Sequence, residues 1–158
     1  KYDLLVHIHL AESQGELAQV REKYQTTPIR HLNNLGLLNE RILGAHMVWL
    51  DDEEIELVAE KGVKVLHCPE SNLKLGSGIA PISKYVKKGI HVCLGTDGPA
   101  SNDNLNMLEE MATMTKLQKG VNLDPTAMTS EQAIKIASYN GFRAMGIPAG
   151  KIEEGYDA

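Results

Sequence analysis

The feature that most constrains the fold is a fourfold alternation between short apolar runs and segments with helix signals. The runs cover residues 4–9, 42–48, 63–68 and 90–96, and each is apolar along most of its length. Strands of this kind are buried on both faces, which is typical of parallel sheets covered by helices. The alternation therefore predicts an α/β fold with four parallel strands.

The segments between and after these runs carry helix start and stop signals. We expect helices at residues 14–24, 28–35, 51–61, 81–88, 104–119 and 130–146. The first of them has Ser13 as a candidate N-cap, with Glu16 completing a capping box. Residues 70–80 are rich in Ser, Asn and Gly, and we expect a loop there.

Each predicted strand ends in a polar residue. The four residues are His9, His46, His67 and Asp97. The carboxyl ends of parallel strands meet at one edge, where (β/α)₈ barrels place their catalytic groups. No Gly-x-Gly-x-x-Gly turn follows any of the strands, so a dinucleotide-binding sheet has no support. The pattern favours a barrel over a doubly wound sheet.

These residue types suit metal-assisted hydrolysis. His9 offers an imidazole ligand for zinc or ferrous iron, and Asp97 offers an oxygen ligand and a place for a proton. Glu12 is one loop step beyond His9, and His46 lies on the next strand, where it could hold a water or polarise a substrate. A divalent metal lowers the pKa of its bound water towards ~7, and a carboxylate can then move the proton.

His7 is separated from His9 by one residue, so both face the same side of a strand. It could be a second metal ligand or a polar residue of the barrel interior, one layer below His9.

Composition excludes several classes of partner. The net charge is −5 and no basic run stands out, so we expect no nucleic acid partner. No apolar stretch approaches the roughly 18 residues that cross a membrane. Cys68 and Cys93 lie in apolar runs, and we interpret them as buried reduced thiols of a cytoplasmic protein.

Four segments resemble the metal-dependent amidohydrolase superfamily, in particular its branch of 5′-methylthioadenosine/S-adenosylhomocysteine deaminases and chlorohydrolase-like enzymes. The segments are residues 6–12 (VHIHLAE), 44–46 (GAH), 67–81 (HCPESNLKLGSGIAP) and 94–102 (LGTDGPASN). The resemblance covers nearly the whole chain, in order.

The resemblance implies the C-terminal half of a (β/α)₈ TIM barrel, with strands five to eight and their helices in residues 1–148. Residues 149–158 would then begin a small flanking β domain. His9 would be the strand-five metal ligand and Asp97 the strand-eight ligand, on one divalent ion, zinc in first place and iron as the alternative.

The resemblance also implies a reaction and a role for each residue. A water would add to the amino-bearing carbon of an adenine ring in a purine nucleoside, and ammonia would leave. Asp97 would take a proton from that water, and His46 would hydrogen-bond to it. Glu12 would bind the purine ring and deliver a proton to it.

The sequence departs from the family at its first metal pair. A His-x-His motif on strand one is absent, and His7 and His9 do not replace it, because Glu12 fits the strand-five pattern. Four strands suit strands five to eight. We therefore expect the chain alone to bind metal poorly and lack activity, unless the missing N-terminal half or a second copy of the chain covers its open edges.

Three alternatives remain open at the level of sequence. The first is a guanine deaminase, a cytosine deaminase or a triazine-type chlorohydrolase of the same superfamily. The second is a non-catalytic half-barrel that serves as an interaction domain. The third is a phosphate-binding barrel, with the Gly-Ser-Gly loop at residues 76–78 as an anion cradle.

Overall fold

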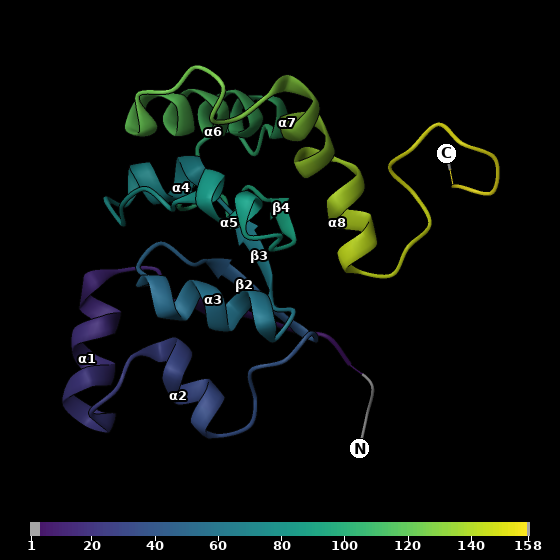
Figure 1. Ribbon diagram of the computed structural model, residues 1–158. Helices are drawn as coiled ribbons and strands as arrows, with labels where there is room; N and C mark the ends of the chain where they lie inside the picture. The colour runs from purple at the N-terminus through teal and green to yellow at the C-terminus, as the bar shows by residue number, and fades with distance from the viewer. Residues whose placement is uncertain (1–3, 158) are drawn as a thin grey trace.

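A computed structural model describes residues 4–157, and a four-stranded parallel sheet forms its centre (Figure 1). The strands lie side by side in chain order: β1 (Val6–Leu10), β2 (Ile42–His46), β3 (Lys64–His67) and β4 (Val92–Leu94). In this register His9 pairs with Ala45, and Leu66 pairs with Cys93. The expected α/β fold with four parallel strands is confirmed, although each strand is shorter than the apolar run that predicted it.

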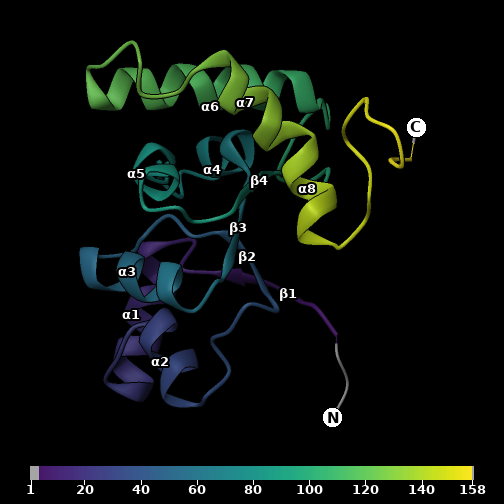
Figure 2. The ribbon, with the colours of Figure 1, turned by 45° about the vertical axis from the view of Figure 1, so that its right-hand side comes forward.

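Helices link and cover these strands. They are α1 (Gln14–Tyr24), α2 (Pro28–Asn34), α3 (Asp52–Glu60), α4 (Pro69–Lys74), α5 (Ile82–Lys87), α6 (Met107–Asn122), α7 (Ser130–Ala137) and α8 (Tyr139–Ala144). In Figure 2, α3 and α5 lie to the left of the strands, whereas α8 lies to the right of β4. None of the helices within residues 4–157 is long and apolar enough to cross a membrane.

The main core fills the space between the sheet and its covering helices. Val65 and Val92 of the sheet pack in one cluster with side chains from α3, α5 and α6. Its largest members are at most 1% exposed and include Ile55, Ile82, Tyr85 and Met114. Burying an aliphatic side chain of this size contributes about 1.5–3 kcal/mol, so this cluster stabilises the packing of the helices on the sheet.

The carboxyl end of β2 has an unusual backbone. His46 and Met47 have φ angles of 69° and 44°, so the strand stops at His46 rather than running to residue 48. The hydroxyl of Tyr85 donates to the Met47 carbonyl at 2.6 Å. Gly44 leaves room for this turn, since a Cβ there would lie 2.6 Å from the Met47 sulfur. The packing of Met47 therefore stabilises a turn directly after His46, at the carboxyl end of β2.

Two expectations from the sequence are wrong. Residues 70–80 are not all loop, because α4 occupies Pro69–Lys74 with Pro69 in its first turn. The helix expected at 130–146 is broken at Ser138, where φ is −128° and ψ is −88°. There Asn140 turns towards β4, and its amide donates to the Val92 carbonyl at 2.7 Å. The helix expected at 104–119 forms over Met107–Asn122, with Asn106 as its N-cap.

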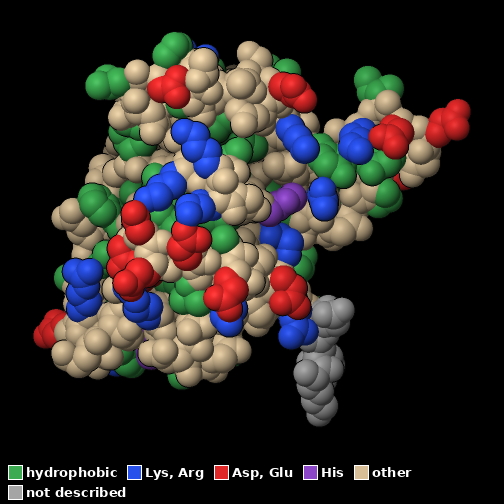
Figure 3. Space-filling view, in the orientation of Figure 1, with side chains coloured by type: hydrophobic (Ala, Val, Ile, Leu, Met, Phe, Trp, Pro, Cys, Tyr) green, Lys and Arg blue, Asp and Glu red, His purple; other side chains and the backbone are tan. Residues whose placement is uncertain are grey.

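The surface outside α3 and α5 carries charges of both signs (Figure 3). Lys84 pairs with Asp52, and Lys88 pairs with Glu56, so these charges join the two helices. At the end of the chain, residues 149–157 form a bridge between Ala149 and Asp157 and no strand. The start of a flanking β domain at 149–158 stays a prediction.

Candidate active site

The loop after β1 is held by the carboxylate of Glu16. Its two oxygens accept from the backbone N–H groups of Ala11 and Glu12, at 2.9 and 2.8 Å. The Ser13 hydroxyl accepts from the Glu16 N–H at 3.2 Å, so Ser13 is the N-cap as expected. The capping box is not formed as predicted, because Glu16 reaches further back along the chain. This contact fixes the backbone that carries Glu12.

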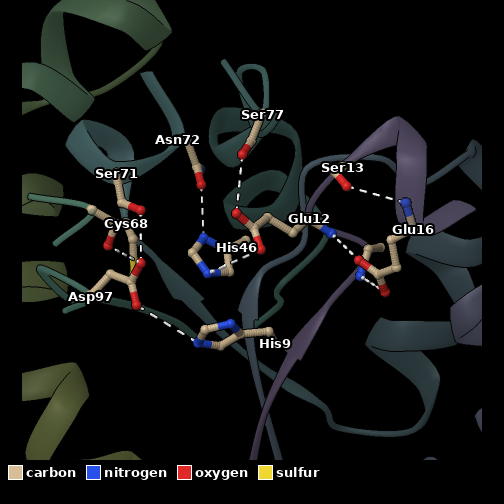
Figure 4. Close-up of polar contacts among 12 residues, drawn as sticks. His9, Glu12, Ser13, Glu16, His46, Cys68, Ser71, Asn72, Ser77 and Asp97 are labelled. Atoms are coloured by element: carbon tan, nitrogen blue, oxygen red, sulfur yellow. Dashed lines mark hydrogen bonds and ion pairs between the residues drawn. The ribbon is translucent and has the colours of Figure 1, made fainter. Parts of the chain in front are cut away.

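His9, Glu12 and His46 converge at the carboxyl edge of the sheet (Figure 4). Their ligand atoms all lie within 4.8 Å of one another. The rings of His9 and His46 meet edge to face, with centroids 4.8 Å apart. Nε2 of His46 lies 3.9 Å from Oε2 of Glu12, which is too long for a direct hydrogen bond.

Asp97 completes the arrangement from the loop after β4. Its Oδ1 lies 3.7 Å from Nε2 of His9, and its Oδ2 accepts hydrogen bonds from the hydroxyls of Ser71 and Ser101. Burial on its own would raise the pKa of Asp97, but these hydroxyls and the Gly98 N–H hold that pKa below its ordinary value. Asp97 is therefore ionised at neutral pH, with Oδ1 turned towards His9.

A partner from α4 orients the ring of His46. Nδ1 of His46 lies 2.8 Å from Oδ1 of Asn72. Because an amide oxygen only accepts, Nδ1 is the donor in this contact. Nε2 is buried and has no hydrogen-bond partner within residues 4–157. A buried nitrogen without a partner fits a group that can hydrogen-bond to it or bind it.

Glu12 is held by the loop between α4 and α5. The Ser77 hydroxyl donates to Oε1 of Glu12 at 3.1 Å, and the Trp49 indole N–H donates to the Ser77 carbonyl at 2.7 Å. Gly78 permits this close packing, because a Cβ there would lie 3.1 Å from the Trp49 ring. Glu12 therefore has its backbone fixed by one loop and its carboxylate by another.

The inner face of the sheet borders a cavity of about 420 Å³. His7 and His9 lie on its wall together with Cys68 and Asp97. His7 lies outside the cluster of His9, Glu12 and His46. Cys68 and Cys93 are free and buried as expected, and burial raises the pKa of each thiol to about 12.

His67 ends its strand as expected but does not join the site. Alternation along β3 places it on the face of Val65, which packs against the helices, and opposite Leu66, which borders the cavity. It is 1% exposed, and burial lowers its pKa to about 3. In the part of the chain that the structure describes, neither ring nitrogen has a hydrogen-bond partner. His67 is therefore a neutral core residue.

The donor set fits a divalent transition metal. Ligand bonds from imidazole or carboxylate are about 2.0–2.2 Å long, so two ligand atoms on one ion lie roughly 3–4 Å apart. His9 Nε2 and Asp97 Oδ1, at 3.7 Å, meet this spacing. The orphaned Nε2 of His46 lies beside the pair, since the rings of His46 and His9 are in contact.

Sequence reasoning missed the residues that orient the site. They are Ser71, Asn72, Ser77 and Ser101. Three of them lie in segment 67–81, to which the sequence assigned no individual roles. The polar residues of that segment were the available signal, but their partners are 26 to 65 positions away along the chain.

Comparison with known proteins gives one family and close relatives. The amidohydrolase family matches residues 1–158. A 5-methylthioadenosine/S-adenosylhomocysteine deaminase of Aquifex aeolicus is 56% identical over all 158 residues. That alignment covers 37% of the relative, so the chain spans little more than a third of its length.

Solved structures share the fold closely. The crystal structure of an adenosine deaminase from Xanthomonas campestris with bound zinc has a TM-score of 0.89 and 42% identity, and the match covers 91% of this chain and 33% of that one. The zinc complex of an atrazine chlorohydrolase from Arthrobacter aurescens has a TM-score of 0.93 and 31% identity, over 99% of this chain and 35% of that one.

Proposed function

The chain belongs to the amidohydrolase family, and from this premise we propose that it supplies part of the active site of a metal-dependent deaminase acting on adenine nucleosides. The substrates would be of the methylthioadenosine and S-adenosylhomocysteine type, as the name of the Aquifex aeolicus relative indicates. The observation that carries the proposal is the convergence of His9, Glu12, His46 and Asp97 at one edge of a parallel sheet.

The fold is an α/β half-barrel of the amidohydrolase type. We assign β1 to β4 to strands five to eight of a (β/α)₈ barrel. Because barrel enzymes place their chemistry at the carboxyl ends of the strands, the edge that holds these four side chains is the catalytic edge.

His9 and Asp97 would hold a divalent ion, with zinc in first place and iron as the alternative. When bound, the ion would supply Lewis acidity and lower the pKa of a water towards ~7. The ionised Asp97 would take a proton from the attacking water. Nε2 of His46, which is buried and unpaired, would hydrogen-bond to that water and orient it.

Glu12 would bind the purine ring and deliver a proton to a ring nitrogen as water adds to the amino-bearing carbon. Its position between Ser77 and His46 supports this role, because the carboxylate is fixed and faces the same space as His46 Nε2. Loss of the amino group as ammonia then restores the aromatic ring. The balance is one water consumed and one ammonia released for each nucleoside.

The test is ammonia release by the full-length protein that contains this chain. We expect turnover of methylthioadenosine and S-adenosylhomocysteine, with guanine and cytosine as comparison substrates. If no adenine compound in this panel releases ammonia, the proposal is wrong. Metal analysis of the same preparation is expected to show a bound transition metal.

A second candidate function is displacement of chloride from a triazine ring. The structural match to the atrazine chlorohydrolase, with a TM-score of 0.93, supports it. The same residues would activate water, and the leaving group would be chloride instead of ammonia. Chloride release from atrazine without ammonia release from any adenine compound would favour this candidate.

The isolated chain is proposed to lack activity. β1 and β4 are the outer strands of the sheet, and the rest of the barrel, or a second copy of this chain, would have to cover their open edges. Turnover of methylthioadenosine by the 158 residues alone, with metal present, would contradict this.

Two buried free thiols support a reducing cytoplasmic location for the parent protein.

A further inference from the structure

A buried carboxylate behind the site has no part in the proposed reaction. Glu110, on α6, is 0% exposed, and burial raises its pKa to about 7. A carboxylate is costly to bury unless its oxygens accept hydrogen bonds, and both oxygens of Glu110 do. One donor comes from the loop that follows β4, and the other comes from α4.

The first donor belongs to the loop that carries Asp97. The amide nitrogen of Asn102 donates to Oε1 of Glu110 and to the carbonyl of Thr96 at 3.0 Å. The amide oxygen of Asn102 accepts from the N–H groups of Asn104 and Leu105, both at 3.1 Å. Asn102 therefore links Thr96 to Asn104 and Leu105 within this loop, and Glu110 joins Asn102 to α6.

Asp97 depends on this loop because its backbone is strained. Its φ angle is 60°, a left-handed conformation that is uncommon for residues other than glycine. The residue before it, Thr96, is the one whose carbonyl Asn102 holds. The contact with Glu110 thus lies one residue away from the strained position.

The second donor is the first turn of α4. The N–H of Glu70 donates to Oε2 of Glu110 at 3.1 Å, and the Thr113 hydroxyl donates to the Glu70 carboxylate at 3.1 Å. The next two residues of α4 are Ser71, which donates to Asp97, and Asn72, whose amide oxygen lies 2.8 Å from Nδ1 of His46. Anchoring Glu70 therefore fixes the helix turn that orients both groups.

We propose that Glu110 is a positioning residue, which joins the Asp97 loop to α4 through one buried carboxylate and so fixes the directions of Asp97 and His46 together. The proposal rests on the proposed function, because it takes Asp97 as a metal ligand and His46 as the partner of the attacking water. Glu110 touches neither the substrate nor the metal in this assignment.

The test uses three variants of the full-length protein and one control. Glu110→Gln keeps one acceptor oxygen and turns an NH₂ group towards the second donor. Glu110→Asp keeps the charge but is one methylene too short to reach both donors. Thr113→Val removes only the contact to Glu70, and Glu22→Gln removes an exposed charge on α1 as the control.

The readouts are zinc affinity, the visible spectrum of the cobalt-substituted protein, and the separate values of kcat and KM. We expect both Glu110 variants to bind zinc about 10- to 100-fold more weakly, as substitutions behind metal ligands do, and to change the cobalt spectrum. We expect kcat to fall with KM unchanged, since Glu110 does not contact substrate. Glu22→Gln should match the parent in every readout.

Three results would overturn the positioning role while leaving the proposed function intact. The first is unchanged zinc affinity and cobalt spectrum in both Glu110 variants, even with a lower melting temperature. The second is weaker zinc binding in Glu110→Gln but not in Glu110→Asp, which would show that the loss of zinc affinity comes from the lost charge and not from the lost hydrogen bonds. The third applies if the Glu110 variants do not fold: Thr113→Val must then weaken zinc binding between about two- and tenfold, and an unchanged affinity contradicts the role. A parent that binds no metal overturns both proposals together.

Discussion

Strands β1 and β2 each supply a histidine to the same site, but they are stabilised differently. All five residues of β2 are buried, and His46 is 0% exposed. In β1 only Leu10 is buried, and the side chain of His9 is 61% exposed. The loop after β1 is held by hydrogen bonds from its backbone to the Glu16 carboxylate and from the Ser77 hydroxyl to Glu12, whereas β2 is held by the core. Chemistry and stability are therefore separable along the chain, with His46 contributing to both.

The largest effect should come from the β1 side, on activity alone. Glu12→Gln removes the proposed proton donor and should lower kcat of the full-length protein by about 10²–10⁴-fold. Glu12 is partly exposed and no large cavity results, so the melting temperature should change little. A kcat within tenfold of the parent would remove Glu12 from the reaction.

Alanine substitutions of His46 and His9 should differ in how much they lower the free energy of unfolding. His46→Ala opens a space in the core and should lower the free energy of unfolding by roughly 2–4 kcal/mol. His9→Ala should lower it by less than about 0.5 kcal/mol when no metal is present, because that side chain is exposed. Urea unfolding of both variants in the presence of a metal chelator measures the two losses of unfolding free energy. Equal losses would contradict the difference in stabilisation between β1 and β2.

A smaller effect is expected where the core holds the end of β2. Tyr85→Phe removes the donor to the Met47 carbonyl and leaves that buried acceptor without its partner. The cost should be about 1–3 kcal/mol of unfolding free energy. Because Met47 follows His46, kcat should also fall, whereas zinc affinity should not. Unchanged stability would show that the turn after β2 does not depend on this bond.

The smallest expected effect, counted per pH unit, is a pH dependence of the free energy of unfolding that comes from His67 of β3. His67 is neutral in the folded chain because burial lowers its pKa to about 3, whereas in the unfolded chain it titrates near its ordinary value of 6.5. As the pH falls below 6.5 the unfolded state gains a proton that the folded state does not, so stability is lost, by up to about 1.4 kcal/mol per pH unit. Urea unfolding between pH 7 and 5 should show this loss in the parent, and parallel curves for His67→Gln would contradict it.

Much of the fold could be predicted because its determinants are local. Continuous apolar runs predicted the four parallel strands, and the strand-end residues His9, His46 and Asp97 were found by their position alone. The carboxyl ends of parallel strands meet at one edge of the sheet, so the order of the strands was enough to place these three residues near one another.

The errors arose where tertiary contacts decided the outcome. Helix α4 was missed because Ser71 and Asn72 are poor helix formers, yet their side chains are occupied by Asp97 and His46. The break at Ser138 follows from the contact of Asn140 with β4. His67 was expected at the rim with the other strand ends, but the pleat of β3 turns it towards the helices.

The contact between Trp49 and Ser77 gives this chain an optical reporter. Trp49 is its single tryptophan, and the indole N–H is bonded to the residue whose hydroxyl holds Glu12. Any displacement of that loop breaks the bond and changes the polarity around the indole, which shifts the emission wavelength. Fluorescence can therefore follow the fixing of Glu12 directly, without a substrate and without a label.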